Sequence, residues 1–438
     1  MRWTRLAAII IAPAACSSNP TSQSTVTYEA DVAPILDAKC VGCHQPGGIA
    51  PFRLDTFADA KLHAVEAVGA IQAKVMPPYL VTHDGTCGNF VHDETLSDAE
   101  IGTISSWVDQ GTVQGTPAAT HVIPPAPKLD GTTDYSTPMI TPLAQGGQFA
   151  AHDEYRCFPI DTHLDTSKFI TDYEVDVGNA AIVHHVIAFL IDPDKPSQTQ
   201  GKTNGEVMQE LDAADPDRAG WPCFGMAGDG LNPDTIPVTW APGQGVIHYP
   251  SGIGIEQTPS QKLVVQMHYN LEDVQGQSDS TTVRLRYADK VDRRAIFLVD
   301  DGFLDTLFTA TPDTLAPHQP SVSYTWQKSA ADYGLNQLPY VDVVGVMPHM
   351  HQRGRTKQIE FVDGSTDTCG AHVDDWDFHW QKFYFYDEAS RPRLGPTSSV
   401  KLTCSYDTSK DDQPVLPGWG TENEMCTAIM MLALPPGL

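Results

Sequence analysis

The sequence predicts a multidomain protein in which a small all-α domain precedes two β-sandwiches. The chain has 438 residues, more than one domain usually contains. Apolar residues recur at helical spacing in three early segments, 28–38, 56–73 and 97–110. From about residue 128 the pattern changes to short apolar or alternating runs separated by Gly and Pro, which is typical of sandwiches.

Local signals set the domain boundaries. Ser97 and Glu100 have the spacing of a capping box, and Gly111 follows the same predicted helix as its stop. The density of proline after residue 115 excludes a helix or a central strand there. We therefore predict a leader at 1–25, a helical domain at 26–115, a linker at 116–127, and sandwiches at 128–290 and 291–438.

The later domains contain a series of predicted strands. The last boundary lies within 288–295, after a strictly alternating strand at 282–287. The other strands are expected at 181–190, 262–269, 340–351, 358–361, 376–386, 400–406 and 424–433.

Composition narrows the classes of function. Hydrophobic residues make up 41% of the chain, enough for real cores. A formal net charge of −28 argues against binding to nucleic acid or to an anionic membrane surface.

The N-terminus has the pattern of an export signal. Residues 1–5 are basic, residues 6–15 are apolar, and the apolar stretch is too short to span a bilayer. Ala14-Ala15-Cys16 resembles a bacterial lipoprotein cleavage site, which would make Cys16 the lipidated residue; an ordinary secretory signal is the alternative. Either reading places the mature protein outside the cytoplasm, where disulfides persist. The lipoprotein reading places it in the cell envelope, in the periplasm or at the outer membrane or cell surface, with a lipid anchor as its only membrane contact.

The first domain contains Cys40-Val41-Gly42-Cys43-His44. In a Cys-x-x-Cys-His motif the two thiols attach haem c, and His44 would be an axial ligand of the iron. A redox or zinc site is the alternative, but zinc needs a second ligand pair at matching spacing and none is nearby.

The sixth haem ligand is predicted to be Met76. It lies in the segment Met76-Pro77-Pro78, and a thioether favours ferrous iron. His63 and His83 compete for this role. With these motifs the domain resembles a small bacterial cytochrome c.

Histidines gather on the predicted strands. His349 and His351 stand two residues apart and can therefore project from one face. His184 and His185 are adjacent, so they can reach a common ion only through a bulge. His268 ends a further strand. Imidazole clusters of this kind suit Cu, Zn, Fe or Ni.

In order along the chain, these motifs resemble the copper type II, ascorbate-dependent monooxygenases. That family has a His-His pair, a His-Tyr, a His-x-His and a late Met-Cys. The corresponding residues here are His184-His185, His268-Tyr269, His349-Met350-His351 and Met425-Cys426, with Trp419-Gly420-Thr421-Glu422-Asn423-Glu424 before the last pair. Arg284-Leu285-Arg286-Tyr287 and Leu402-Thr403-Cys404-Ser405-Tyr406 are further matches.

The resemblance implies two jelly-roll-like copper domains. The first would hold copper through His184, His185 and His268, and the second through His349, His351 and Met425. Two imidazoles and a thioether favour Cu(I), so the second site would be catalytic. Because bound imidazoles must be neutral, copper occupancy is expected to fall as the pH drops through about 6.

Six cysteines remain after Cys16 and the haem motif. The resemblance implies a Cys404–Cys426 disulfide beside Met425. Cys157–Cys223 is expected to staple the first sandwich. Cys87 and Cys369 are left either as an interdomain bridge or as two free thiols.

The sequence does not name a substrate. Peptide hydroxylases of the family hold the substrate carboxylate with an Arg where this chain has Met347, and they use a Tyr where it has Ile429. A peptidylglycine substrate is therefore not expected. Met347 and Ile429 instead predict a more apolar substrate pocket.

The predicted function is hydroxylation of a substrate C–H bond with O2. The fused haem domain would relay electrons from a donor, either an ascorbate-like reductant or a redox protein. The alternatives are a non-hydroxylating copper and haem electron-transfer lipoprotein and a redox sensor.

Overall fold

The computed structural model describes residues 25–438 apart from 47, 49, 92–93, 118–127, 146–151, 225, 243, 273 and 421. Residues 1–24 of the predicted leader, with Cys16, and most of the predicted linker lie outside the described residues. No helix among the described residues combines the length and the apolar character that a membrane span requires.

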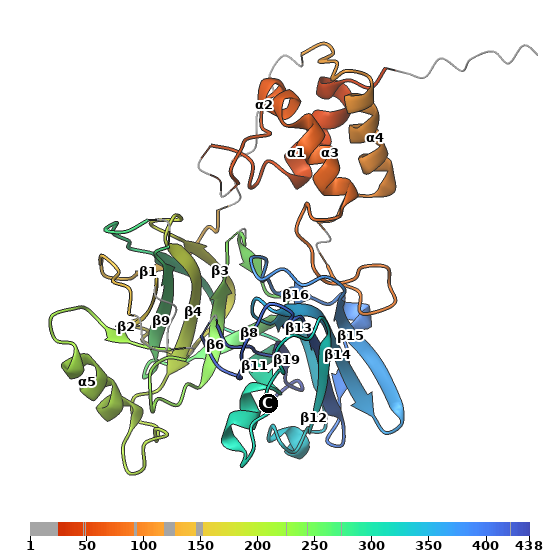
Figure 1. Ribbon diagram of the computed structural model, residues 1–438. Helices are drawn as coiled ribbons and strands as arrows, with labels where there is room; N and C mark the ends of the chain where they lie inside the picture. Colours follow the sequence, from red (N-terminus) through yellow and green to blue (C-terminus); the bar gives the residue numbers. More distant parts are fainter. Residues whose placement is uncertain are drawn as a thin grey trace, which may run out of the picture.

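A small helical unit comes first (Figure 1). It contains a π-helical turn and four α-helices: η1 (Tyr28–Val32), α1 (Ala33–Lys39), α2 (Phe57–Leu62), α3 (Ala64–Gln72) and α4 (Asp98–Asp109). Its core includes Leu36, Ile104 and Trp107. The predicted capping box is present, because Ser97 N donates to Glu100 Oε2 at 2.7 Å and Glu100 N donates to Ser97 Oγ at 3.3 Å.

The predicted helix at 56–73 is wrong as a single element. His63 separates α2 from α3, with φ at −103° and ψ at 12°. Its ring Nδ1 lies 2.9 Å from Glu66 Oε2, in the first turn of α3.

The first β-sandwich has a five-stranded sheet in the order β5-β2-β9-β4-β6. Facing it are β1, β10, β3 and β8, with β7 paired to β3. The strands are β1 (Thr133–Ser136), β2 (Asp153–Ile160), β3 (Lys168–Asp176), β4 (Val183–Ile191), β5 (Trp221–Pro222), β6 (Thr235–Trp240), β7 (Ile247–His248), β8 (Ile253–Gln257), β9 (Lys262–Asn270) and β10 (Thr282–Ala288). Helix α5 (Asn204–Ala214), which the sequence analysis missed, packs on the outer face of the five-stranded sheet.

The second β-sandwich has a four-stranded sheet in the order β12-β18-β14-β15, packed on β11-β19-β13-β16. The short strand β17 also pairs with β13. The strands are β11 (Arg293–Asp301), β12 (Val322–Ser329), β13 (Val341–His349), β14 (Gly354–Asp363), β15 (Thr366–Val373), β16 (Tyr384–Phe385), β17 (Arg393–Leu394), β18 (Ser399–Tyr406) and β19 (Thr427–Ala433).

The two sandwiches are joined edge to edge and face to face. Strands β8 and β11 pair in parallel, which makes one 10-stranded sheet across both sandwiches (Figure 1). Phe383, Ile429 and Met431 of the second sandwich share a buried cluster with Met267 and Leu285 of the first. The hydrophobic effect therefore resists separation of the sandwiches, and the residues on each are held in a fixed relative position.

Two further expectations are corrected. The predicted strand at 376–386 is a loop that ends in the two-residue strand β16. Its polar groups bond locally instead of joining a sheet, as when His379 N donates to the side chain of Asp377 at 2.9 Å. Residues 79–91 were assigned to the helical domain, but Val81 belongs to the core of the second sandwich.

Candidate metal centres

Three histidines of the first sandwich converge on one point. His184 and His185 lie on β4, and His268 lies on β9. The register between these strands shifts between Val183 and His185, which is the irregularity that two adjacent histidines on one site require. The three Nδ1 atoms are separated by 3.1 Å, 3.2 Å and 3.4 Å.

The chemistry of this trio fits a metal ion. A point equidistant from the three nitrogens lies about 1.9 Å from each, close to the roughly 2.0 Å of metal–imidazole bonds. Burial, the main cause, lowers the pKa of His184, and it holds the pKa values of His185 and His268 well below 6.5, with the neighbouring histidines adding to it. A neutral imidazole carries one N–H and one lone pair, so three Nδ1 atoms that face one another cannot all form hydrogen bonds with each other. A cation at their centre can accept all three lone pairs.

The second pair of histidines is oriented by acceptors behind the rings. His349 Nδ1 lies 2.7 Å from Gln381 Oε1, and His351 Nδ1 lies 3.0 Å from Asn423 O. Gln381 Nε2 already donates to Phe378 O at 2.8 Å, so its oxygen faces His349. Both Nδ1 atoms must therefore carry the proton, which leaves both Nε2 atoms free as ligands.

Burial also keeps this pair neutral. The rings of His349 and His351 lie 5.1 Å apart, centroid to centroid, at 86°. Burial is the largest cause of their pKa shifts and lowers the pKa of His349 to about 3 and that of His351 to about 4. Neutral imidazoles with free Nε2 atoms are the form that binds a transition metal.

Glu424 fastens the Met425 segment to the His-x-His segment. Its fully buried carboxylate accepts hydrogen bonds from the backbone N–H of Arg353 at 2.6 Å, of His351 at 3.0 Å and of Met425 at 3.3 Å. Burial raises the pKa of Glu424 to about 7. The side chain of Met425, 4% exposed, is thus carried on backbone that is tied to His351.

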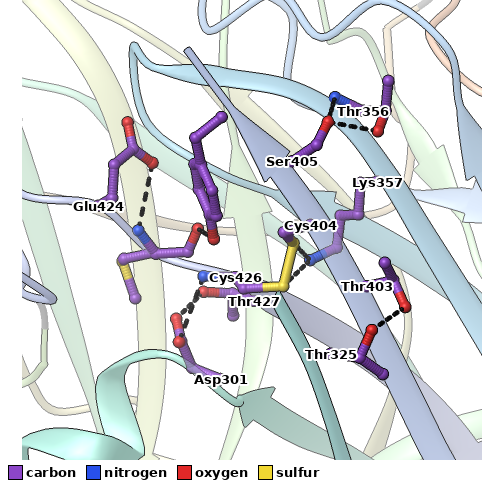
Figure 2. Close-up of a disulfide and its surroundings, with 12 residues drawn as sticks. Asp301, Thr325, Thr356, Lys357, Thr403, Cys404, Ser405, Glu424, Cys426 and Thr427 are labelled. Carbon is purple, nitrogen blue, oxygen red and sulfur yellow. Dashed lines mark hydrogen bonds between the residues drawn. A yellow bond between two sulfur atoms is a disulfide. The ribbon is translucent and has the colours of Figure 1, made fainter. Parts of the chain in front are cut away.

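The Cys404–Cys426 disulfide lies beside this segment, with a buried lysine against it (Figure 2). Lys357 Nζ is 3.3 Å from Cys404 Sγ and 3.5 Å from Cys426 Sγ. Burial lowers the pKa of Lys357 to about 7. Asp301, whose pKa burial raises, accepts from Cys426 N at 3.3 Å and from the hydroxyl of Thr427. The backbone on both sides of Cys426 is therefore held from within the core.

Three disulfides occur among the described residues. Cys157–Cys223 and Cys404–Cys426 are the pairs that the sequence analysis expected. The third, Cys87–Cys369, joins the segment that follows the first helices to β15. Of the two alternatives left open for these cysteines, a bridge or two free thiols, the structure has the bridge.

One phenyl ring lies between the two groups of histidines. The ring of Phe378 stacks on that of His184 at 5.5 Å and 26°, and it meets the ring of His351 edge-on at 6.1 Å and 89°. A cavity of about 350 Å³ reaches His184, His268 and Phe378. The two candidate centres are therefore neighbours across a single side chain.

The Cys-x-x-Cys-His motif follows α1. Cys40 and Cys43 are not in disulfides, and burial, the main cause, raises the pKa of the Cys40 thiol to about 12 and that of Cys43 as well. His44 Nδ1 lies 2.9 Å from Phe52 O, which leaves Nε2 free. Two uncommitted thiols and a ring anchored through Nδ1 fit covalent haem attachment and axial ligation.

The candidates for the sixth haem ligand lie in different places. Met76 packs, half-buried, against the helical core. His63 stacks on Phe52 at 4.2 Å, and the ring of His44 contacts the same phenyl ring at 4.7 Å. His83 lies beside Tyr79 in the segment that packs on the second sandwich.

Four residues that surround the histidines were missed from the sequence. The sequence analysis named Asn423 and Glu424 within the segment before Met425 but gave them no role, although their nearness to a proposed ligand was an available signal. Gln381 and Phe378 gave no such signal, because their partners come from distant strands; 32 positions separate Gln381 from His349.

Comparisons with known proteins agree with the metal sites that the histidine groups indicate. Residues 303–435 match the model of the copper type II ascorbate-dependent monooxygenase C-terminal domain. The chain is also 23% identical over 282 residues to tyramine beta-hydroxylase of Caenorhabditis briggsae, a match that covers 62% of this chain and 43% of that protein. The chain thus spans less than half the length of that relative. Both findings support the copper type II ascorbate-dependent monooxygenase family.

Likeness to solved structures is weak. The major capsid protein P2 of bacteriophage PM2 is 6% identical, covers 64% of this chain and 97% of that chain, and gives a TM-score of 0.26. A structure of broad bean stain virus is 8% identical in sequence. That match covers 69% of this chain and 88% of the viral chain, and its TM-score is also 0.26. These scores carry no argument about fold or function.

Proposed function

We propose that this chain is a copper-dependent monooxygenase that hydroxylates a C–H bond of an apolar substrate. The observation that carries the proposal is the pair of neighbouring histidine groups, three converging Nδ1 atoms on one sandwich and two free Nε2 atoms on the other. The two groups differ in their donor atoms. An electron carrier needs no two distinct sites, whereas an oxygenase can use a three-imidazole site for electrons and a site with a thioether such as that of Met425 for O2, because a thioether favours Cu(I).

In this proposal His184, His185 and His268 hold one copper, and His349, His351 and Met425 hold the other. Copper would supply one-electron storage at the first site and O2 activation at the second. The reaction consumes one substrate, one O2, two electrons and two protons, and it yields the hydroxylated product and water.

The chain's own residues prepare these sites. Gln381 and Asn423 keep His349 and His351 in the tautomer that offers Nε2. Glu424 ties the Met425 backbone to that of His351, which limits the movement of a thioether ligand. Such supporting contacts typically contribute about 10- to 100-fold to metal affinity.

The surface next to His349 favours an apolar substrate. Val299, Ile429 and Met347 are partners across β11, β19 and β13, and so form one row. Met347 shares the face of β13 with His349, two residues on. No residue of the row can pair with a carboxylate, which supports exclusion of a peptide C-terminus.

We further propose that Cys40 and Cys43 attach haem c, with His44 and Met76 as axial ligands. The haem would pass electrons singly to the copper sites, after it receives them from an ascorbate-like reductant or a redox protein. The three disulfides support an oxidising compartment, in keeping with export to the cell envelope and a lipid anchor on Cys16.

Labelled oxygen tests the proposed reaction. Copper-loaded, reduced protein is incubated with ¹⁸O2 and a panel of uncharged aromatic and aliphatic compounds, with a peptidylglycine included for contrast. We expect uptake of O2 to rise with an apolar member and one ¹⁸O atom to appear in its product. Uptake that no compound alters, with no labelled product, would favour the electron-transfer alternative.

The pKa values of His349 and His351 predict how the protein responds to acid. Below pH 6.5 the unfolded chain gains protons on these two residues. In the folded chain His351 stays neutral down to about pH 4 and His349 down to about pH 3. Metal-free protein should therefore lose stability as the pH falls, by about 2 kcal/mol per histidine at pH 5.

This prediction replaces the earlier expectation that copper leaves near pH 6, because burial delays protonation of the ligands. We expect the copper held by His349 and His351 to remain bound at pH 5 and to leave at about pH 4. Urea denaturation of metal-free protein at pH 7 and pH 5, together with copper analysis after dialysis, measures both effects. A His349→Gln, His351→Gln variant should lose the part of the pH dependence of stability that these two residues contribute, about 2 kcal/mol per histidine between pH 7 and pH 5, and keep the part that His184, His185 and His268 contribute. Full loss of copper between pH 6.5 and 5.5 would contradict the prediction.

A further inference from the structure

Part of the helical unit is built into the second sandwich. Residues 79–91, here called the strap, leave the helices and lie along the end of β15 and along β16 (Figure 1). Val81 forms an antiparallel bridge to Val373, and Thr82 N donates to His372 O at 2.8 Å. Phe90 forms a second bridge to Tyr386, and Val91 N donates to Phe385 O at 2.9 Å. The strap thus pairs with backbone at two places.

The strap is also fixed by side chains. The Cys87–Cys369 disulfide fastens it to β15. Leu80 N donates to the hydroxyl of Tyr384 at 3.1 Å, and the rings of Tyr79 and Tyr384 meet edge-on at 5.1 Å. Val81 is 1% exposed, so the contact is part of a core and not a loose surface contact.

The chain between the two places held by the strap is residues 374–383, here called the bridge loop. Trp376 of this loop donates from Nε1 to His351 O at 3.0 Å. Phe378 lies between the rings of His184 and His351, and Gln381 accepts from His349. One ten-residue stretch therefore touches both groups of histidines.

The bridge loop is held by the sandwiches as well as by the strap. Trp376 N donates to Arg355 O at 2.7 Å, and Phe383 belongs to the buried cluster between the sandwiches. β16, at its end, pairs with β13 only at Gly345 and Val346. Lys382 forms an ion pair with Glu94, just beyond the strap, and lies over the ring of Tyr79 at 5.6 Å. The strap and Glu94 thus supply one part of the contacts that hold the ends of the loop, beside those from the sandwiches.

We propose that the strap is a positioning element of both metal centres, acting through the bridge loop. By fixing the two ends of the loop, the strap sets where Phe378 packs and where Gln381 meets His349. Trp376, Phe378 and Gln381 are positioning residues in this proposal, and the strap acts on the ligands through them. The inference rests on the proposed function only in that the histidines bind copper.

Hydrogen exchange on metal-free protein tests the coupling without reference to copper. The strap-release variant carries Cys87→Ser, Cys369→Ser and Val81→Ser. We expect the amides of the bridge loop to exchange at least about tenfold faster in this variant, together with those of the strap. Cys157→Ser, Cys223→Ser is the matched control, since it removes a disulfide of the first sandwich and should leave the bridge loop unchanged. A released strap with an unchanged bridge loop would overturn the proposal.

Copper titration and electron paramagnetic resonance of Cu(II) supply the second readout, on variants with all proposed ligands intact. Gln381→Leu removes the acceptor of His349 and should weaken copper binding at one site by about 10- to 100-fold. Phe378→Leu should alter the Cu(II) spectra of both sites. Gln381→Glu keeps an oxygen at the same place and should restore most of the affinity.

The control in the same loop is Asp375→Asn, an exposed position, which should leave affinity and spectra unchanged. If Phe378→Leu and Gln381→Leu also left both unchanged, the positioning role would be wrong. Failure of the wild-type protein to bind copper would refute the proposed function instead, and the exchange experiment would still decide the coupling of strap and loop.

Discussion

Replacing His349 and His351 with alanine should abolish substrate hydroxylation while the chain remains folded. The proposed second site would keep only Met425, and a lone thioether does not hold copper in competition with water and buffer. We expect the turnover rate to fall by at least about 10³-fold, equivalent to about 4 kcal/mol in the barrier. The three-histidine site, on other strands, should keep its copper.

The matched control is His372→Ala. His372 lies in the same sandwich, half-buried, and its ring contacts Asp374 and no proposed ligand. This variant should retain activity. If the His349→Ala, His351→Ala variant hydroxylated substrate at more than about one tenth of the normal rate, the reaction would have to be assigned elsewhere.

Replacing Cys40 and Cys43 with alanine should abolish electron delivery from haem. Without the two thiols the haem has no covalent attachment, and the protein should lose its haem absorption. Turnover driven through the haem should disappear, and turnover with a small reductant such as ascorbate should persist. In the unaltered protein, reoxidation of reduced haem should proceed at a rate independent of protein concentration, because donor and acceptor belong to one chain.

The strap changes the physical basis of this second prediction. The linker alone would leave the haem unit to search for its partner, whereas Cys87–Cys369 and the strap fix part of that unit on the second sandwich. We therefore expect a single fast phase of haem reoxidation. Reoxidation that slowed in proportion to dilution, or haem-free protein that worked equally well with every donor, would contradict an intramolecular relay.

Much of the candidate site could be predicted from residue spacing. Histidines two apart on a strand share a face, and the structure has His349 and His351 with their rings 5.1 Å apart. The adjacent pair His184 and His185 required a bulge, and the register shifts at that point. The capping box of α4 was also readable, since Ser97 and Glu100 satisfy each other locally.

Helix α5 could have been found by the same reasoning. Thr203 and Glu206 form a capping box like that of α4, and Val207, Met208 and Leu211 follow at helical spacing. The expectation of few helices after residue 128 outweighed this local signal.

The surroundings of the ligands could not be predicted, because they depend on contacts between distant parts of the chain. Nothing local marks Gln381 as the acceptor for His349, nor Phe378 as the ring between two sandwiches. The strap is a similar case. Val81 looks like any apolar residue of a helical domain, and only tertiary packing assigns it to the other core.

The central claim is that one chain holds two different copper sites, and X-ray absorption of fully loaded, reduced protein tests it most directly. Elemental analysis of the same sample should find two coppers per chain. The spectrum should show imidazole ligands at both coppers and a sulfur ligand at only one of them. Met425→Ala should remove this sulfur signal, while the three-histidine copper stays. A single copper per chain, or a spectrum without sulfur that Met425→Ala does not change, would contradict the account.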